Sequence, residues 1–285
     1  MSDGKVYIDG QVCAEAEAAV PVSDRGFLYG DAIFETLRTH GGEPFLLDRH
    51  LERLFDSCEE LGIAPRETPA EVAEITLQLA ADLGVEASIR IAVTRGSAYG
   101  PWPKDLPEAG RTVIAVRPLA PHPEELYSRG MRLATSRIMR FEGSPLAGHK
   151  TANYLESVLA RGDAAERGAD EALLLNTAGR VAELSAANVF AVVYGRILTP
   201  ALEEGPLPGI TRQVVLELAE AAGIKTHSGQ LAPEALADAD EAFATNSLLG
   251  ICPISELDGV KIGEVTPGPI TRQIQEAYRL ETSGS

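Results

Sequence analysis

Apolar residues in the N-terminal third recur with two different periods, which predicts a mixture of strands and helices. Residues 5–13 alternate in polarity on either side of Asp9 and Gly10, which predicts two strands joined by a tight turn. Residues 32–47 hold two apolar runs around a His-Gly-Gly-Glu turn, which predicts a hairpin. Helical spacing that stops at a glycine is found over residues 46–63 and 71–85. Further strands are expected at residues 88–96 and 112–119.

The C-terminal half continues the mixture, and together the two halves predict the α+β class. Strands are expected at residues 131–140, 171–176, 189–194, 196–200 and 241–246, and helices at residues 151–168 and 206–224. A proline-rich stretch between the halves predicts a linker. We therefore expect a small N-terminal α/β domain at residues 1–117, a linker at 118–129 and a larger domain at 130–285.

Composition and charge narrow the class of partner. The 285 residues are 45% hydrophobic, as in ordinary globular proteins, and carry a formal net charge of −17. Nucleic acids and anionic membranes bind basic surfaces, so neither is expected as a partner. The sequence holds no apolar run of about 18 residues or more, as a membrane span would need, and its N-terminus lacks the apolar core of a signal peptide.

Common motifs of catalysis and metal binding are absent from the sequence. Cys13, Cys58 and Cys252 are widely spaced and form no CxxC pair, which favours a reducing, cytoplasmic location. The five histidines show no HExxH spacing, so no metal site is expected. The phosphate-binding motifs GxxxxGK[ST] and GxGxxG and the nucleophile motif GxSxG do not occur either.

One lysine stands out by its position. Lys150 lies in AGHKTANYLES, residues 147–157, after a loop and at the start of the predicted helix. The positive end of a helix dipole lowers a lysine pKa, and the neutral amine that results can form a Schiff base with a carbonyl. A solvated surface lysine is the alternative interpretation of the same pattern.

Three other features could bind an anion or pair with a cation. Gly209, Ile210 and Thr211 begin a predicted helix whose free N–H groups could hold a phosphate, and Ser247 follows a predicted strand. Glu183 precedes a turn of small residues and could pair with a protonated heterocycle nitrogen. Arg53 on the helix at 46–63 could bind a phosphate or pair with a neighbouring acid. Taken together with a Schiff-base lysine, these are the groups that hold pyridoxal 5′-phosphate (PLP).

The sequence resembles the class IV (fold-type IV) PLP-dependent aminotransferases. This family contains branched-chain aminotransferases, D-amino-acid aminotransferases and aminodeoxychorismate lyases. The resemblance implies a two-domain fold, with a mixed, barrel-like β core in the larger domain, and a homodimer whose site lies at the domain junction. The residues that carry it span nearly the whole chain, at 22–38, 47–54, 149–176, 181–190, 208–213 and 258–276.

The resemblance also implies a role for each cofactor-binding residue. Lys150 would form the internal aldimine with PLP and move the proton during transamination. Glu183 would pair with the protonated pyridine nitrogen, and Tyr154 would donate a hydrogen bond to the phenolic oxygen. Asn188 would order the turn beside Glu183. The phosphate would be bound by Arg53, Gly209, Ile210, Thr211, Asn246 and Ser247.

The resemblance leaves the substrate open. Tyr29, Phe34, Arg38 and Arg90 match the branched-chain pattern of an aromatic pocket with a carboxylate-binding arginine. Tyr29 would act from the neighbouring subunit. We expect a branched-chain L-amino acid and a 2-oxo acid such as 2-oxoglutarate.

Two departures favour the other groups of the family. Ser88 stands where the branched-chain pattern has a tyrosine, and the loop TNSLLG replaces GTAAE. Arg95 in TRGS is therefore a rival carboxylate binder. An aminodeoxychorismate lyase and a D-amino-acid or (R)-amine transaminase stay open as alternatives. Outside the family, a cofactor-free Schiff-base lyase would leave Glu183 unused, and a non-catalytic binding module would leave Lys150 unexplained.

Overall fold

The computed structural model describes residues 4–101 and 106–283 and confirms the α+β fold class. The chain forms two compact units, one of residues up to Pro121 together with His149–Asn153, the other of His122–Gly148 and the residues from Tyr154 onward. The expected linker at 118–129 spans the change at Pro121. The segment around Lys150 groups with the first unit, although the sequence placed it in the larger domain.

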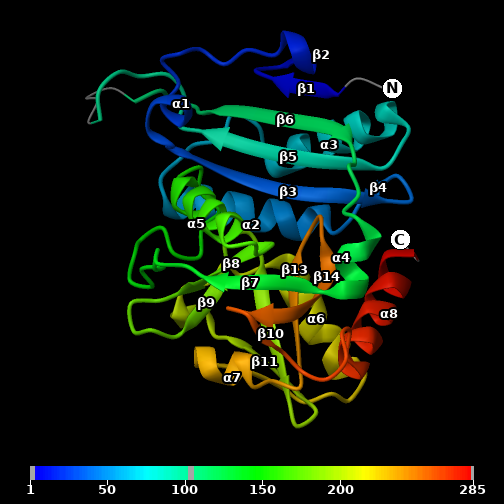
Figure 1. Cartoon of the computed structure of the whole chain (residues 1–285). Coiled ribbons are helices and arrows are strands. Elements are labelled where there is room, and N and C mark those ends of the chain that lie inside the picture. The colour runs from blue at the N-terminus through cyan, green and yellow to red at the C-terminus, as the bar shows by residue number, and fades with distance from the viewer. Residues whose placement is uncertain (1–3, 102–105, 284–285) are drawn as a thin grey trace. The chain divides into compact units, whose positions relative to one another are not determined.

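The first unit is an antiparallel sheet with helices on one face (Figure 1). Its strands have the order β2-β1-β6-β5-β3-β4. The elements are β1 (Lys5–Ile8), β2 (Gln11–Ala14), a 3₁₀ turn (Glu15–Glu17), α1 (Arg25–Tyr29), β3 (Ala32–His40), β4 (Glu43–Pro44), α2 (Leu47–Glu60), α3 (Pro69–Leu83), β5 (Ala87–Thr94) and β6 (Arg111–Pro118).

Alternation along β3 and β5 decides which side of this sheet is covered. Ile33 and Leu37 of β3 pack with Ile89 and Ile91 of β5 in one core cluster, to which α2 and α3 contribute their apolar faces. The residues between them therefore point to the other face. The predicted tight turn is also confirmed: Asp9 and Gly10 both have positive φ, which suits the two-residue hairpin turn that joins β1 and β2.

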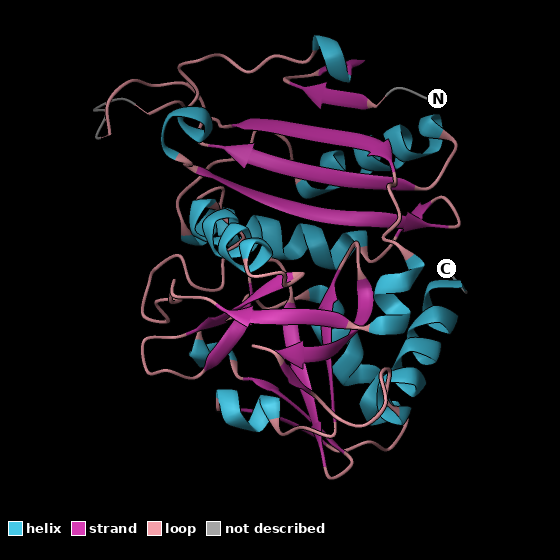
Figure 2. Ribbon diagram, in the orientation of Figure 1, coloured by secondary structure: helices cyan, strands magenta, loops and turns pink. Residues whose placement is uncertain are grey.

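The second unit contains a mixed nine-stranded sheet (Figure 2). Its order is β12-β11-β10-β13-β14-β7-β8-β9, with β15 paired to β14. The elements are α4 (Glu124–Arg129), β7 (Met131–Thr135), α5 (Leu155–Glu166), β8 (Glu171–Leu175), β9 (Val181–Leu184), β10 (Asn188–Val193), β11 (Arg196–Pro200), a 3₁₀ turn (Leu202–Glu204), α6 (Ile210–Ala221), β12 (Thr226–Gly229), α7 (Pro233–Ala237), β13 (Glu241–Asn246), β14 (Gly250–Leu257), β15 (Val260–Lys261) and α8 (Pro269–Ser283).

Several elements differ from the sequence-based expectation. Helix α4 occupies the second half of the expected linker, and the strand expected at 131–140 ends at Thr135. It ends there because the Ser136 hydroxyl accepts a hydrogen bond from the Ile138 amide and forms a turn. Strand β14 and helix α8 were not anticipated. Within residues 4–101 and 106–283, no helix combines the length and the apolar character needed to cross a bilayer.

Candidate active site

Lys150 lies in an extended segment beside the edge of β3, not at a helix terminus. The Phe34 amide donates to the Lys150 carbonyl at 2.9 Å, and the Ala152 amide donates to the Ala32 carbonyl at 2.8 Å. Helix α5 begins only at Leu155. The prediction that Lys150 opens a helix is therefore wrong, because pairing with β3 takes the backbone groups that would have formed the first turn. The helix-dipole argument for its reactivity does not apply.

The face of the first sheet opposite its helices brings Lys150 together with predicted substrate residues. Phe34, Arg38 and Arg90 all point to the face opposite the helices, as the pairing of Arg38 with Ser88 and the alternation along both strands require. The Arg90 guanidinium carbon lies 3.6 Å from the centroid of the Phe34 ring, and Lys150 Nζ lies 4.6 Å from it. Two cationic groups thus share one aromatic ring, which is a suitable surface for an amino acid carboxylate and an apolar side chain.

Arg53 lies on the helix-covered side of β3. It is half of a buried ion pair, since its Nε donates to Glu35 Oε1 at 2.7 Å and its terminal nitrogen to Oε2 at 2.6 Å. Glu35 alternates with Phe34 along β3 and so points toward α2. The sequence did not indicate that Glu35 is buried, because an acidic residue in a predicted strand is expected to face solvent.

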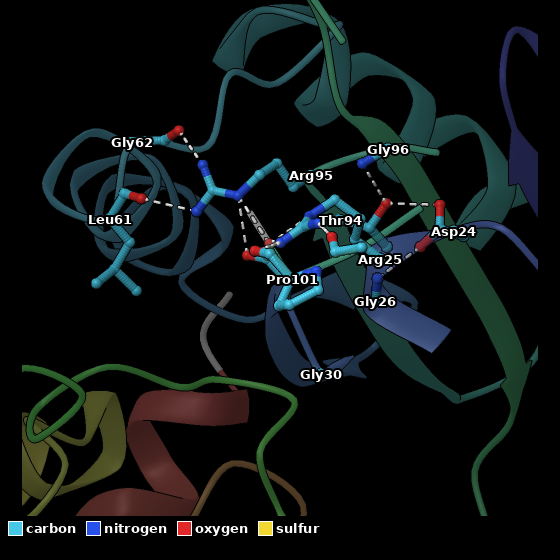
Figure 3. Close-up of polar contacts among 12 residues, drawn as sticks. Asp24, Arg25, Gly26, Gly30, Leu61, Gly62, Thr94, Arg95, Gly96 and Pro101 are labelled. Atoms are coloured by element: carbon cyan, nitrogen blue, oxygen red, sulfur yellow. Dashed lines mark hydrogen bonds and ion pairs between the residues drawn. The ribbon is translucent and has the colours of Figure 1, made fainter. Parts of the chain in front are cut away.

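Arg95, the rival carboxylate binder, is engaged within the chain (Figure 3). Its Nε donates to both oxygens of Asp31 at 3.0 and 2.9 Å, while its terminal nitrogens donate to the carbonyls of Leu61 and Gly62. Arg25 Nε binds the same Asp31 at 2.8 Å. Burial raises the pKa of Asp31, but hydrogen bonds from the two arginines outweigh it and leave that pKa below its usual value. These contacts favour an anchoring role for Arg95 over substrate binding.

Tyr29 ends the short helix α1 and is 40% exposed. The helix is fixed at its start, where the Asp24 carboxylate accepts a hydrogen bond from the Gly26 amide at 2.8 Å (Figure 3). Arg25 lies with its guanidinium carbon 5.0 Å from the centroid of the Tyr29 ring. The part of Tyr29 that stays accessible suits the predicted contribution to a neighbouring subunit, which stays a prediction.

In the second unit, Glu183 lies on β9 with both carboxylate oxygens bonded. Oε1 accepts from the Arg140 guanidinium at 2.7 Å, and Oε2 accepts from the Leu207 amide at 2.9 Å. The residue is 7% exposed. A buried carboxylate held by a guanidinium and a backbone amide is fixed in place and can pair with a protonated heterocycle. Arg140 was missed by sequence reasoning, since nothing local to residue 140 indicates a partner 43 residues away.

The backbone of Leu207 joins the start of α6 to Glu183. Besides its amide bond to Glu183, Leu207 accepts through its carbonyl from the Gly209 amide at 2.8 Å and from the Asn188 side chain at 2.8 Å. A Cβ on Gly209 would lie 2.0 Å from the Asn188 side-chain oxygen, so any larger residue there would displace the Asn188 side chain from its contact with Leu207. The Asn188 side chain thus fixes the segment before α6, whose Leu207 amide binds Glu183, and its expected role in the turn beside Glu183 stays a prediction.

The N-terminus of α6 has the features of an anion site. Gly209 offers no side chain to cap it, its first turn holds no acidic residue, and Ile210 and Thr211 are buried there. The side chain of Asn246, at the end of β13, donates to the Ala186 carbonyl at 3.0 Å. This contact ties the loop that holds Ser247 to the turn after Glu183. A phosphate ester fits the uncapped helix start, because its charge matches the dipole and the free N–H groups.

Tyr154 also lies in the second unit, immediately before α5. Its hydroxyl donates to the Ser185 carbonyl at 3.3 Å, and the Ser185 hydroxyl in turn donates to the buried carboxylate of Glu171. Burial raises the pKa of Tyr154, and the nearby carboxylates of Glu183 and Glu171 raise it further. The phenol is therefore held protonated and able to donate a hydrogen bond. Glu171, like Arg140, was not anticipated.

Comparison with known proteins places these features in one family. The model of the amino-transferase class IV family matches residues 32–257. A putative branched-chain-amino-acid aminotransferase of Methanocaldococcus jannaschii is 36% identical over 277 residues, covering 96% of this chain and 95% of that protein. A D-alanine aminotransferase of Bacillus licheniformis is 32% identical over 284 residues, with 96% of both chains covered. A crystal structure of a branched-chain aminotransferase from Thermoproteus uzoniensis superposes with a TM-score of 0.90 at 33% identity, covering 98% of this chain and 95% of that one.

Proposed function

Because this chain belongs to the class IV aminotransferases, we propose that it moves the amino group of a branched-chain L-amino acid to 2-oxoglutarate or another 2-oxo acid. The observation that carries the substrate class is the shared face of β3 and β5, where Phe34 lies beside Lys150 and Arg90. An aromatic ring suits an aliphatic side chain, and the guanidinium suits a carboxylate. The names of the M. jannaschii and T. uzoniensis relatives support the same class.

The cofactor of this family is PLP, and the residues of the second unit fit it. The uncapped start of α6 suits its phosphate, and the buried carboxylate of Glu183 suits its protonated ring nitrogen. We assign the phosphate to Gly209, Ile210, Thr211, Asn246, Ser247 and Arg53. When bound, PLP serves as the electron sink for the carbanion formed at the amino acid Cα.

Lys150, Glu183 and Tyr154 would each have a separate role toward the bound cofactor. Lys150 would hold the cofactor covalently through its Nζ and, as a free amine, would serve as the base for the proton at the amino acid Cα. Glu183 would pair with the protonated ring nitrogen, and Arg140, which donates to Glu183 Oε1 at 2.7 Å, would hold the carboxylate in place. Tyr154 would donate a hydrogen bond from its hydroxyl to the phenolic oxygen of the cofactor, in place of the one it makes to the Ser185 carbonyl.

A panel of half-reactions tests the substrate class. We expect L-leucine, L-valine and L-isoleucine to convert the enzyme-bound cofactor with a kcat/KM at least about 10-fold above that of D-alanine, since the wrong stereoisomer misplaces either the carboxylate or the side chain. The loss of absorbance of the bound cofactor measures each rate. D-alanine transamination is the second candidate, favoured by Ser88 in place of a tyrosine, and faster reaction with D-alanine would establish it. Release of pyruvate from aminodeoxychorismate would instead identify a lyase.

We further propose that the protein is a homodimer. Helix α5 exposes Leu155, Val158 and Leu159 at 68%, 57% and 55%, spaced so that they form one apolar stripe. Monomeric proteins rarely leave such a stripe on a helix in water, and the family resemblance implies a second copy of this chain as its cover.

Light scattering tests the assembly. The unaltered chain is expected at twice its mass of 30.3 kDa, and a Val158→Asp, Leu159→Asp variant at the monomer mass, because two buried charges disfavour the contact. Leu77→Asp, an exposed apolar residue of α3, is the matched control and keeps the dimer. A monomeric mass for the unaltered chain at micromolar concentration would refute the proposal.

A further inference from the structure

A buried polar cluster of three residues lies between β3 and α2 in the first unit. Glu35 and His50 are each 1% exposed. Glu35 Oε2 accepts from His50 Nδ1 at 2.7 Å and from Arg53 at 2.6 Å, and Oε1 accepts from Arg53 Nε at 2.7 Å. The carboxylate therefore holds the Arg53 guanidinium by two parallel hydrogen bonds and is itself held by the imidazole.

The position of Glu35 in the sequence makes this cluster unusual. Glu35 stands between Ile33 and Leu37, both almost wholly buried, on the apolar face of β3. His50 and Arg53 are three positions apart on α2 and therefore share the face that meets it. Burial of an acid costs stability unless every lone pair is matched, and an apolar residue would fill the same space without that cost. Packing therefore does not explain why a charged cluster occupies this position.

The ionisation of Glu35 is fixed by its two partners. Burial alone raises the pKa of its carboxyl, but hydrogen bonds from His50 and Arg53, together with the charge of Arg53, bring that pKa down to about 2. Since the carboxylate can only accept hydrogen bonds, His50 Nδ1 carries the proton of their shared bond. The orientation of the imidazole is thus set by Glu35, and that of the guanidinium by both.

We propose that Glu35 is a positioning residue that orients the Arg53 guanidinium for the phosphate of the cofactor, with His50 bracing the carboxylate. The inference rests on the proposed function, in which Arg53 binds that phosphate. An arginine side chain loses much rotational freedom when it binds an anion. A guanidinium that a bidentate carboxylate already holds in its plane has lost that freedom before the anion binds. Binding of the phosphate then costs less side-chain entropy and is tighter.

Removing the charge of the Glu35 carboxylate tests the proposal, because its effect should appear only for a ligand that carries the phosphate. The apoenzyme of Glu35→Gln is titrated with PLP and, separately, with pyridoxal, which has the same ring and aldehyde but no phosphate. We expect the Kd for PLP to rise by about 10-fold and the Kd for pyridoxal to change by less than about 2-fold, as for other residues that orient a ligand-binding group. Fluorescence of the bound cofactor measures both affinities.

Matched variants separate this effect from general damage. Glu67→Gln alters another buried carboxylate of the first unit, which accepts from the Tyr7 hydroxyl at 2.7 Å, and is expected to leave both affinities unchanged. If Glu35→Gln does not fold, His50→Gln is titrated in its place and is expected to show a smaller selective loss. Parallel loss of both affinities, or no loss in either, overturns the proposal.

The underlying assignment of Arg53 is tested by one more variant. Arg53→Gln is expected to weaken PLP but not pyridoxal, and by more than Glu35→Gln does. Unchanged PLP affinity in Arg53→Gln removes Arg53 from the phosphate site and the positioning role of Glu35 with it. Transamination by the unaltered chain would still stand in that case, so failure of this inference and failure of the proposed function give different results.

Discussion

Replacing Lys150 by alanine is expected to lower kcat for transamination by about 10⁴-fold or more, because one side chain supplies both the covalent attachment and the Cα proton transfer. The variant should still bind PLP, since the residues assigned to the phosphate and the ring nitrogen are untouched. Its cofactor is expected to leave on gel filtration and to resist fixation by borohydride. Single-turnover absorbance changes with L-leucine measure the rate.

The same variant can be rescued in part if the lysine acts as the base. A small primary amine such as methylamine, added at high concentration, is expected to restore a fraction of the rate that rises with the concentration of neutral amine. Lys225→Ala is the matched control, because Lys225 is an exposed lysine of the second unit whose sequence neighbours lie outside the assigned site and whose backbone carbonyl, which the substitution keeps, accepts from the Ile197 amide. Full activity in Lys150→Ala would falsify the assignment of this lysine.

Patterns of polarity predicted much of the fold because they report local geometry. Helix α2 and the β1–β2 hairpin were expected within a few residues of their bounds, since both have a clear period and a turn signal at one end. Strand β14 was missed because Pro253 interrupts an otherwise apolar run, although that proline is tolerated opposite Phe243. Helix α8 was not predicted because few of its residues are apolar. Its buried residues, such as Ile274 and Tyr278, lie about one turn apart, which is too sparse a pattern to indicate a helix.

The candidate site shows a different limit of sequence reasoning. The resemblance named Lys150, but the local argument for it was wrong, since the pairing of its backbone with β3 is a long-range contact that no local period reveals. Glu35, Arg140 and Glu171 escaped notice for the same reason. Each becomes meaningful only through a partner brought close by folding, as Arg140 does through Glu183.

Glu183 is the second residue for which a large loss is expected. Glu183→Gln should lower kcat by about 10²- to 10³-fold, comparable to the removal of one preorganised electrostatic contact in other enzymes. The amide keeps an acceptor for the Leu207 N–H but turns its NH₂ group toward Arg140, which also donates. The ring nitrogen would then face neutral and cationic groups only, so its protonated form, and with it the electron sink, is disfavoured.

A shift in the bound cofactor's absorbance with pH distinguishes this electrostatic role from simple destabilisation of the fold. In Glu183→Gln the ring nitrogen is expected to lose its proton at lower pH than in the unaltered enzyme, because the neighbouring negative charge is gone. Glu241→Gln is the matched control: Glu241 is likewise 7% exposed and lies on a strand of the second unit, but it binds the amides of Ile270 and Thr271 at the start of α8. That variant should lower the melting temperature and leave the pH profile and kcat unchanged. If Glu183→Gln behaved in the same way, Glu183 would be a structural partner of Arg140, and the carboxylate that serves the ring nitrogen would have to be sought elsewhere in the chain.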